Sequence, residues 1–386
     1  MSTNRNKPAD ISTYKSLPAH IHPQFKSPRE RDRIHRSCCP CSKFSLSTLY
    51  RMFCCGVFCL MTMSIALYYP EFINQNQTLS FHSDGNFKIL QVADVHFGNG
   101  KTDKCKDLTE NEERFPCSSL NSTSFIEEIY ALEKPDLVVY TGDNIDKTAS
   151  DAMTSMNKVF NLRNKGPWAA VLGNHDGEST LTRYQVMRYI MTLKNNMVNI
   201  GSYDVTGYGN YVIKLSNGIS PIFNLFFLDS GSKSKNPLIP GYAKIDISQI
   251  NWYKSESSSS SNKLPAIAFF HIPLPEYGTC SLTDIKGTKK DTVGSPKLNS
   301  GLYSEMQSQG DVKMINVGHD HNNDFCGACY GIYLCYGGGV GYNTYGSPDL
   351  SKRVRLIEIG EFGKTITTWK RLHDGKNTKI DEQKIM

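Results

Sequence analysis

Residues 312–321 read Val-Lys-Met-Ile-Asn-Val-Gly-His-Asp-His, an apolar run that ends in a glycine and two histidines. An apolar run of this length that stops at a glycine is typical of a strand covered on both faces of a sheet. In open α/β sheets, ligands bind beyond the carboxyl ends of the strands. The segment therefore predicts a buried strand that carries imidazole groups to a site at the sheet edge.

Four other stretches have the same form, an apolar run followed by residues that bind metals well. The runs at 88–93, 136–141, 168–172 and 266–270 each end at Asp, Asn or His, directly or after one glycine. One such stretch is weak, because Asp often caps a helix and Asn often serves a turn. Five in succession indicate a single site. The candidate residues are Asp94, His96, Asp143, Asn174, His175, Asp176, His271, His319 and His321.

These side chains suit first-row transition metals. Imidazole suits zinc and iron, and carboxylate or amide oxygen suits manganese and iron. Two metals roughly 3.5–4 Å apart can bind both the attacking and the leaving oxygen of an in-line displacement. Such a pair needs a shared carboxylate, and we expect Asp143 to supply it. Water on such metals becomes a nucleophile near neutral pH.

The order D-x-H, G-D, G-N-H-D, H and G-H-x-H resembles the calcineurin-like metallophosphoesterase superfamily, over roughly residues 86–371. The stretches 269–277, 318–327 and 336–342 are similar to a subgroup related to purple acid phosphatases. The resemblance implies a four-layer α/β/β/α sandwich, whereas the strand pattern alone predicts only an α/β fold. The sequence itself predicts helices at 121–133, 150–162 and 179–193, and a closing pair of antiparallel strands at 353–359 and 366–370.

The resemblance also implies a role for each candidate residue. One metal would be held by Asp94, His96 and His321, and the second by Asn174, His271 and His319, with Asp143 between them. His175 would lie over the substrate oxygen as a proton donor or charge stabiliser, oriented by Asp176.

The chain departs from the purple enzymes at two positions. Those enzymes have a tyrosine ligand three residues after the bridging aspartate, where this chain has Asp146, and a glycine where it has His96. We therefore expect no tyrosinate-to-iron colour. The metal pair stays open between Fe/Zn, Fe/Mn and Mn/Mn.

The function implied is hydrolysis of a phosphate ester by hydroxide held between the two metals. Phosphate monoesters are the expected substrates, because of the stretches similar to purple phosphatases. The alternatives are a phosphodiesterase acting on a nucleotide or a phospholipid head group, and a catalytically silent membrane receptor or scaffold. Tyr342 and Tyr345 either line the substrate side of the metals or pack the glycine-rich loop onto the sheet.

The charge of the chain is concentrated at its start. Residues 1–51 hold 10 Lys/Arg and 3 Asp/Glu, whereas the remaining residues hold 33 and 34. The catalytic part is therefore not basic, and nucleic acid is not an expected partner. The composition of the first 36 residues predicts disorder.

A length of 386 residues and a hydrophobic content of 39% allow one large domain with an accessory segment. The oligomeric state is not predicted.

Residues 52–69 contain no charge, which is the short end of the length needed for a spanning helix. Basic residues precede this run and Glu71 follows it, so the amino terminus is expected in the cytosol. A cleaved signal peptide, giving a secreted protein, is the alternative, although a lead of 51 residues exceeds the usual n-region. We expect a cytosolic arm at 1–51, a type II anchor at 52–69, a stalk at 70–85 and a lumenal or extracellular enzyme domain at 86–386.

Two further patterns agree with that placement. The N-x-S/T glycosylation acceptors, Asn76 and Asn121, both follow the anchor. Six of the 12 cysteines also lie beyond it, which allows three disulfides in an oxidising compartment. Cys105 and Cys117 are the expected pair, since they would close a local polar loop. Cys326 and Cys329 form a single C-x-x-C, which favours structural disulfides over a zinc site.

Overall fold

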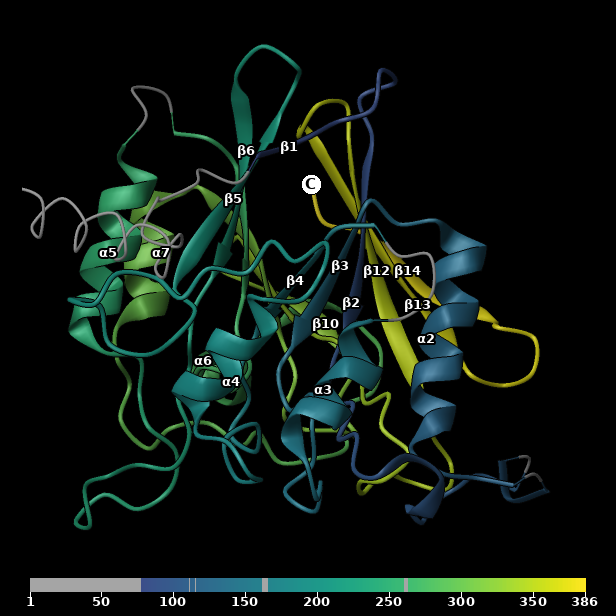
Figure 1. Cartoon of the computed structure of the whole chain (residues 1–386). Coiled ribbons are helices and arrows are strands. Elements are labelled where there is room, and N and C mark those ends of the chain that lie inside the picture. Colours follow the sequence, from purple (N-terminus) through teal and green to yellow (C-terminus); the bar gives the residue numbers. More distant parts are fainter. Residues whose placement is uncertain (1–77, 111, 115, 162–165, 260–262) are drawn as a thin grey trace, which may run out of the picture. The chain divides into compact units, whose positions relative to one another are not determined.

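The computed structural model describes residues 78–110, 112–114, 116–161, 166–259 and 263–386, which belong to one compact unit that spans residues 74–386 (Figure 1). The basic arm, the predicted anchor at 52–69 and the acceptor Asn76 lie outside the described residues. Within the described ranges, no helix is both long enough and apolar enough to cross a bilayer. Residues of the expected stalk form the first strand, β1 (Thr78–Ser80), which pairs with β5.

One sheet has six strands, and the predicted runs at its centre are parallel. Strand β2 pairs with β3, and β3 with β4, in parallel register, whereas β12, β13 and β14 continue the sheet in antiparallel fashion. The pair at 353–359 and 366–370 is confirmed as β12 and β13. In spatial order the strands are β14 (Lys379–Lys384), β13 (Thr365–Leu372), β12 (Arg353–Gly360), β2 (Phe87–Val92), β3 (Leu137–Thr141) and β4 (Trp168–Val171).

The second sheet has eight strands, and its parallel centre holds the other two predicted runs, β7 and β9. Antiparallel strands β10 and β8 close one edge. In spatial order the strands are β1, β5 (Tyr211–Ser216), β6 (Pro221–Phe227), β7 (Ala266–Phe269), β9 (Val312–Val317), β11 (Ile332–Tyr336), β10 (Cys326–Cys329) and β8 (Thr283–Lys286).

The two sheets face each other, and helices cover their outer faces (Figure 1). Across the shared face, Gln91 of β2 donates a hydrogen bond to the Val317 carbonyl of β9 at 3.0 Å. Helix α3 (Ala152–Phe160) packs on the six-stranded sheet, where Phe160 stacks on Trp168 with ring centroids 4.6 Å apart. Helix α5 (Ile247–Ser257) covers the other sheet through Tyr253. The four-layer α/β/β/α arrangement is therefore confirmed.

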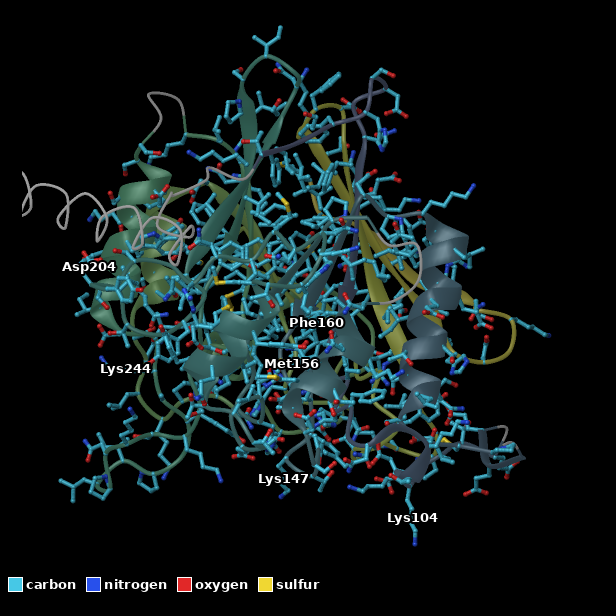
Figure 2. The ribbon with its side chains drawn as sticks, viewed as in Figure 1. Lys104, Lys147, Met156, Phe160, Asp204 and Lys244 are labelled. Atoms are coloured by element: carbon cyan, nitrogen blue, oxygen red, sulfur yellow. A yellow bond between two sulfur atoms is a disulfide. The ribbon has the colours of Figure 1, made fainter. Side chains whose placement is uncertain are left out.

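The remaining helices complete these outer layers. Helix α2 lies over the six-stranded sheet with α4 beside α3, and α7 lies beside α5. In Figure 2 the side chains of Met156 and Phe160, from α3, lie among the interior side chains, whereas Asp204 lies at the periphery. The elements are η1 (Gly100–Thr102), η2 (Glu112–Arg114), α2 (Leu120–Glu133), α4 (Arg183–Ile190), α6 (Glu276–Thr279) and α7 (Leu302–Gln309).

Three disulfides link the cysteines that follow the predicted anchor. The expected bridge between Cys105 and Cys117 is confirmed. Cys326 and Cys329 each enter a separate disulfide, so the C-x-x-C pair is structural, as expected. The other two bridges are Cys280–Cys329 and Cys326–Cys335.

A buried ion-pair network joins the two sheets behind the predicted site. The Asp324 carboxylate lies 2.5 Å from Arg353 Nε of β12 and 2.6 Å from Lys370 Nζ of β13. Asp324 comes three residues after His321 and two before β10, so it ties the end of the G-H-x-H segment to the opposite sheet. All three side chains are 3% exposed or less. Burial without a counter-charge is costly, so Arg353 depends on Asp324, whereas Lys370 also pairs with Asp381 at 2.7 Å.

Asp324→Asn keeps the volume of the side chain and removes its charge. We expect it to lower the free energy of unfolding by roughly 3 kcal/mol, because buried Arg353 loses its carboxylate partner and Lys370 keeps only Asp381. Denaturant unfolding of the variant and the parent chain measures this. Asp204→Asn, which changes an exposed carboxylate, is the matched control. Equal midpoints for all three proteins would contradict a stabilising role for the network.

Candidate metal centre

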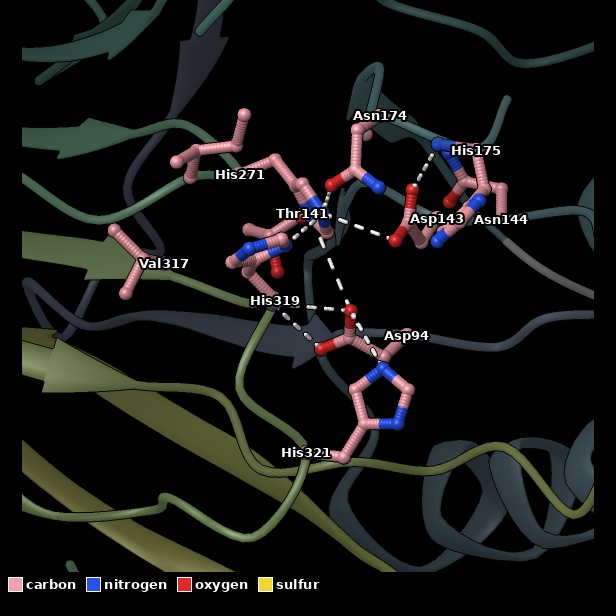
Figure 3. Close-up of polar contacts among 12 residues, drawn as sticks. Asp94, Thr141, Asp143, Asn144, Asn174, His175, His271, Val317, His319 and His321 are labelled. Carbon is pink, nitrogen blue, oxygen red and sulfur yellow. Dashed lines mark hydrogen bonds and ion pairs between the residues drawn. The ribbon is translucent and has the colours of Figure 1, made fainter. Parts of the chain in front are cut away.

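The ends of five strands from both sheets meet at one place (Figure 3). Asp94 follows β2, Asp143 follows β3 and Asn174 follows β4, all in the six-stranded sheet. His271 follows β7 and His319 follows β9 in the other sheet. The structure therefore brings all seven predicted metal ligands together. They are buried: Asp94, His96, Asp143, Asn174, His271, His319 and His321.

Unusual backbone conformations turn these side chains toward a common centre. Asp94, His96, Asp143 and His319 all have positive φ, at 57°, 43°, 49° and 81°. Each such conformation costs on the order of 1–3 kcal/mol for a residue other than glycine, and it persists only where the surroundings hold it. Gly142, with φ of 91°, is required next to Asp143, because a Cβ there would lie 2.6 Å from His271 Nδ1.

The first cluster of donor atoms consists of Asp94, His96 and His321, with all three donors within 4.8 Å of one another. His96 Nε2 lies 3.2 Å from His321 Nε2, and His321 Nε2 lies 3.6 Å from Asp94 Oδ1. Donors bonded at about 2.1 Å to one tetrahedral ion lie about 3.4 Å apart. The spacing of this cluster therefore fits one metal ion.

The second cluster consists of Asp143, His271 and His319. His271 Nε2 lies 3.1 Å from Asp143 Oδ2 and 3.3 Å from His319 Nδ1. The amide oxygen of Asn174 also lies 3.2 Å from His271 Nε2. Asp143 Oδ2 also lies 3.5 Å from His96 Nε2 in the first cluster. One carboxylate oxygen therefore lies between the clusters, where the bridging ligand was predicted.

Outer contacts orient the rings toward these clusters. His271 Nδ1 donates to the Thr141 carbonyl at 2.8 Å, and His321 Nδ1 donates to the Tyr345 carbonyl at 2.9 Å. Each bond leaves the Nε2 lone pair for a metal. His96 Nδ1 lies 3.3 Å from the Asp146 carboxylate. The two positions at which the chain departs from the purple enzymes are thus in contact with each other.

The electrostatics of the centre also favour a cation. Burial lowers the pKa of His319 to about 3 and holds that of His321 well below its usual value, so both rings are neutral and can offer a lone pair. Burial raises the pKa of Asp94 to about 7. The Asp143 carboxylate, against the effect of burial, raises the pKa of His271 to about 9, so a metal would displace the proton from this ring. A buried carboxylate without a counter-charge is unfavourable, and a bound cation would stabilise its ionised form. The donor set therefore fits a binuclear metal site.

The predicted relation between His175 and Asp176 is wrong in its geometry. His175 Nδ1 lies 2.5 Å from Glu178 Oε2, and the His175 side chain is 31% exposed. Asp176 is fully buried and accepts hydrogen bonds from the Gly173 and Asn144 amides at 2.7 and 2.8 Å. Asp176 therefore joins the loops that follow β3 and β4, and Glu178 is the residue that orients His175.

A cavity of roughly 330 Å³ opens over the donor atoms. It is lined by His175 and by loop residues that carry no recognisable motif, among them Tyr242, Thr292 and Gly294. Sequence reasoning missed these residues because no strand run or spacing marks them. Tyr345 lines the cavity, whereas Tyr342 is buried and bonds to Glu112, so the two tyrosines have different roles. None of the described lining residues is Lys or Arg.

Comparisons with known proteins agree with this geometry. The family model described as Calcineurin-like phosphoesterase matches residues 87–323. "Probable inactive purple acid phosphatase 29" from Arabidopsis thaliana is 40% identical, over 80% of this chain and 88% of that protein. "Phosphatase DCR2" from Saccharomyces cerevisiae is 34% identical, over 80% of this chain and 58% of that protein.

One solved structure with a similar fold is described as a dimetal phosphatase from Danio rerio. It has a TM-score of 0.53 and 15% sequence identity, and the match covers 78% of this chain and 99% of that one. At this identity the likeness concerns the fold alone.

Asp143→Asn replaces the carboxylate between the clusters by a neutral amide with one oxygen. We expect metal content to fall from two ions per chain to one or none, because both clusters lose the shared charge. Elemental analysis of protein purified in metal-replete buffer measures this. Asp374→Asn, on the turn between β13 and β14, is the matched control and should retain both ions. Two ions in Asp143→Asn would contradict its place between the metals.

Proposed function

The chain belongs to the calcineurin-like phosphoesterase family, and from that premise we propose that it is a binuclear-metal phosphatase that hydrolyses phosphate monoesters. The observation that carries the proposal is the pair of donor clusters that share Asp143 and lie beneath an open cavity. All seven expected donors and His175 are present in this chain. Five of these residues line the cavity itself: His96, Asp143, His175, His319 and His321.

The two metals, when bound, would activate a water molecule and offset the charge of the phosphoryl group. The chain itself holds and orients the reactants. Asp94, Asp143 and the four histidines are held in place by the strand ends and their outer contacts, so little reorganisation is needed on binding. His175, on the cavity wall, donates a proton to the leaving oxygen. Glu178 binds Nδ1 of His175, so Nε2 is the ring nitrogen left for the substrate.

The cavity supports a monoester over a larger diester. Its volume is at the low end of the range of about 300–1,000 Å³ for ligand sites. No described lining residue carries a guanidinium or ammonium group, so the phosphoryl charge would be met chiefly by the metals. A phosphodiesterase acting on a nucleotide or a phospholipid head group remains the alternative for the same centre.

We also propose that the catalytic domain is lumenal or extracellular and is anchored by residues 52–69. Three disulfides in the described part of the chain support an oxidising compartment, since such bridges are rare in the cytosol. The uncharged run after a basic arm supports the type II orientation.

A second candidate function is suggested by the names of relatives. Two Arabidopsis thaliana proteins, 40% and 39% identical to this chain, are named "probable inactive" purple acid phosphatases. A silent member of the family could bind metals and a partner without hydrolysis. The intact donor set and the accessible His175 favour the phosphatase.

An assay of the full chain, produced by a secretory route, separates these functions. We expect two bound metals and turnover of an aryl phosphate monoester at least tenfold faster than that of the matching diester. Elemental analysis and release of the aryl alcohol measure the two quantities. Faster diester turnover would favour the phosphodiesterase, and two metals without hydrolysis of either ester would favour the silent member.

His175→Ala should lower kcat by roughly 10²- to 10⁴-fold, because a proton donor is lost. Bound metal should stay at two ions per chain, since His175 lies outside both donor clusters. Glu178→Gln should give a smaller loss of kcat, because the ring is retained but loses its charged partner.

His82→Ala, at an exposed histidine in the segment between β1 and β2, is the matched control and should retain full activity. Loss of metal from His175→Ala would show that His175 is a ligand and would refute its assignment as the proton donor.

A further inference from the structure

Three contacts join Tyr345 to the predicted ligand His321. The Tyr345 carbonyl accepts from His321 Nδ1 at 2.9 Å, and the Tyr345 hydroxyl accepts from the His321 main-chain amide at 3.1 Å. The two rings also stack, with centroids 3.9 Å apart and planes 16° apart. One residue therefore constrains the main chain, the ring plane and the tautomer of His321.

Tyr345 is itself fixed from behind. Its hydroxyl donates to Asp291 Oδ2 at 3.2 Å. Asp291 Oδ2 also accepts a hydrogen bond from the main-chain amide of Asn322 at 3.0 Å. Asn322 directly follows His321, so these contacts close a ring around the ligand. On the other side, the Gly346 amide donates to Asp107 at 3.1 Å, within the loop closed by the Cys105–Cys117 disulfide.

The other donors are supported differently. Asp143, Asn174 and His271 lie two or three residues beyond the ends of β3, β4 and β7, and the Nδ1 of His271 binds a strand carbonyl, that of Thr141. His321 lies four residues beyond β9, and Tyr345 lies in a segment without helix or strand. Tyr345 is 44% exposed, so it is not a residue of the hydrophobic core. Its contacts serve the ligand more than the stability of the fold.

We propose that Tyr345 is a positioning residue for His321 and that it sets the metal affinity of the cluster formed by Asp94, His96 and His321. The proposal rests on the metal roles assigned above, but not on turnover of any ester. The second cluster meets Tyr345 at one longer contact, from the Tyr345 hydroxyl to the His319 main-chain carbonyl at 3.5 Å, and its affinity should depend on Tyr345 much less. Contacts of this kind, one step removed from the metal, typically change affinity by roughly 10- to 100-fold.

The test compares the Zn²⁺ affinities of variants of the full chain. The metals are removed with a chelator, and Zn²⁺ is returned in competition with a chromophoric chelator. We expect two tight sites in the parent chain. Tyr345→Ala should weaken one site by roughly 10- to 100-fold and leave the other within about twofold. Both variants keep the main-chain carbonyl that binds His321 Nδ1. Tyr345→Phe should have a smaller effect than Tyr345→Ala, because it also keeps the stacked ring and loses only the hydroxyl contacts.

Two further comparisons identify the site and guard against misfolding. His96→Ala removes a donor of the first cluster, so adding Tyr345→Ala to it should not change the remaining site. Tyr330→Phe, at a 79% exposed tyrosine in the turn between β10 and β11, is the matched control. If Tyr345→Ala does not fold, Tyr345→Phe and Asp291→Asn decide, and each should weaken one site.

The proposal is overturned if both sites keep their affinity in the Tyr345 variants or if both weaken equally. It is also overturned if Tyr345→Ala weakens the site that remains in His96→Ala. A parent chain with fewer than two sites refutes the binuclear assignment and this proposal together. A parent chain with two sites and no hydrolysis refutes only the phosphatase, and the affinities still decide the role of Tyr345.

Discussion

The Oδ2 atom of Asp143 lies within 3.5 Å of a histidine from each donor cluster, and most features of the centre follow from that position. To place it there, the chain takes a left-handed conformation at Asp143 and needs a glycine directly before it. The Asp143 side chain is 2% exposed, where a charge without partners is costly. Two cations that share this oxygen would compensate for both the burial and the strain.

The same requirement explains why two sheets are needed. A single parallel sheet presents its strand ends in one row, whereas this centre takes donors from β2, β3 and β4 of one sheet and from β7 and β9 of the other. The sheets must therefore keep a constant separation at this end. The Asp324 network contributes to this, because it binds cations of β12 and β13 directly behind the G-H-x-H segment.

Much of this arrangement could be predicted because the strands are buried on both faces. Continuous apolar runs mark such strands, and the polar residue that ends each run marks the sheet edge. Contacts within loops could not be predicted in this way. Asp176 directly follows His175, but its carboxylate turns to the amides of Gly173 and Asn144, and Glu178 takes the ring nitrogen. Tyr242 reaches the cavity from a loop with no periodic pattern, so only tertiary packing places it.

The helix α5 was missed for a related reason. Its N-cap Asp246 and its Gln249 form a capping box, but few of its residues are apolar, and Ile250 and Tyr253 are the buried hydrophobic ones. Hydrophobic periodicity therefore had little to detect.

The two departures from the purple-enzyme pattern, His96 and Asp146, were visible in the sequence, but their contact with each other was not. His96 and Asp146 are 50 residues apart, and the fold brings them within 3.3 Å. Asp146 binds Nδ1 of His96, which leaves Nε2 for a metal. The histidine that replaces the glycine therefore has its ring orientation fixed in the way that is typical of metal-binding histidines. Loss of donors is therefore not a ground for inactivity in this chain.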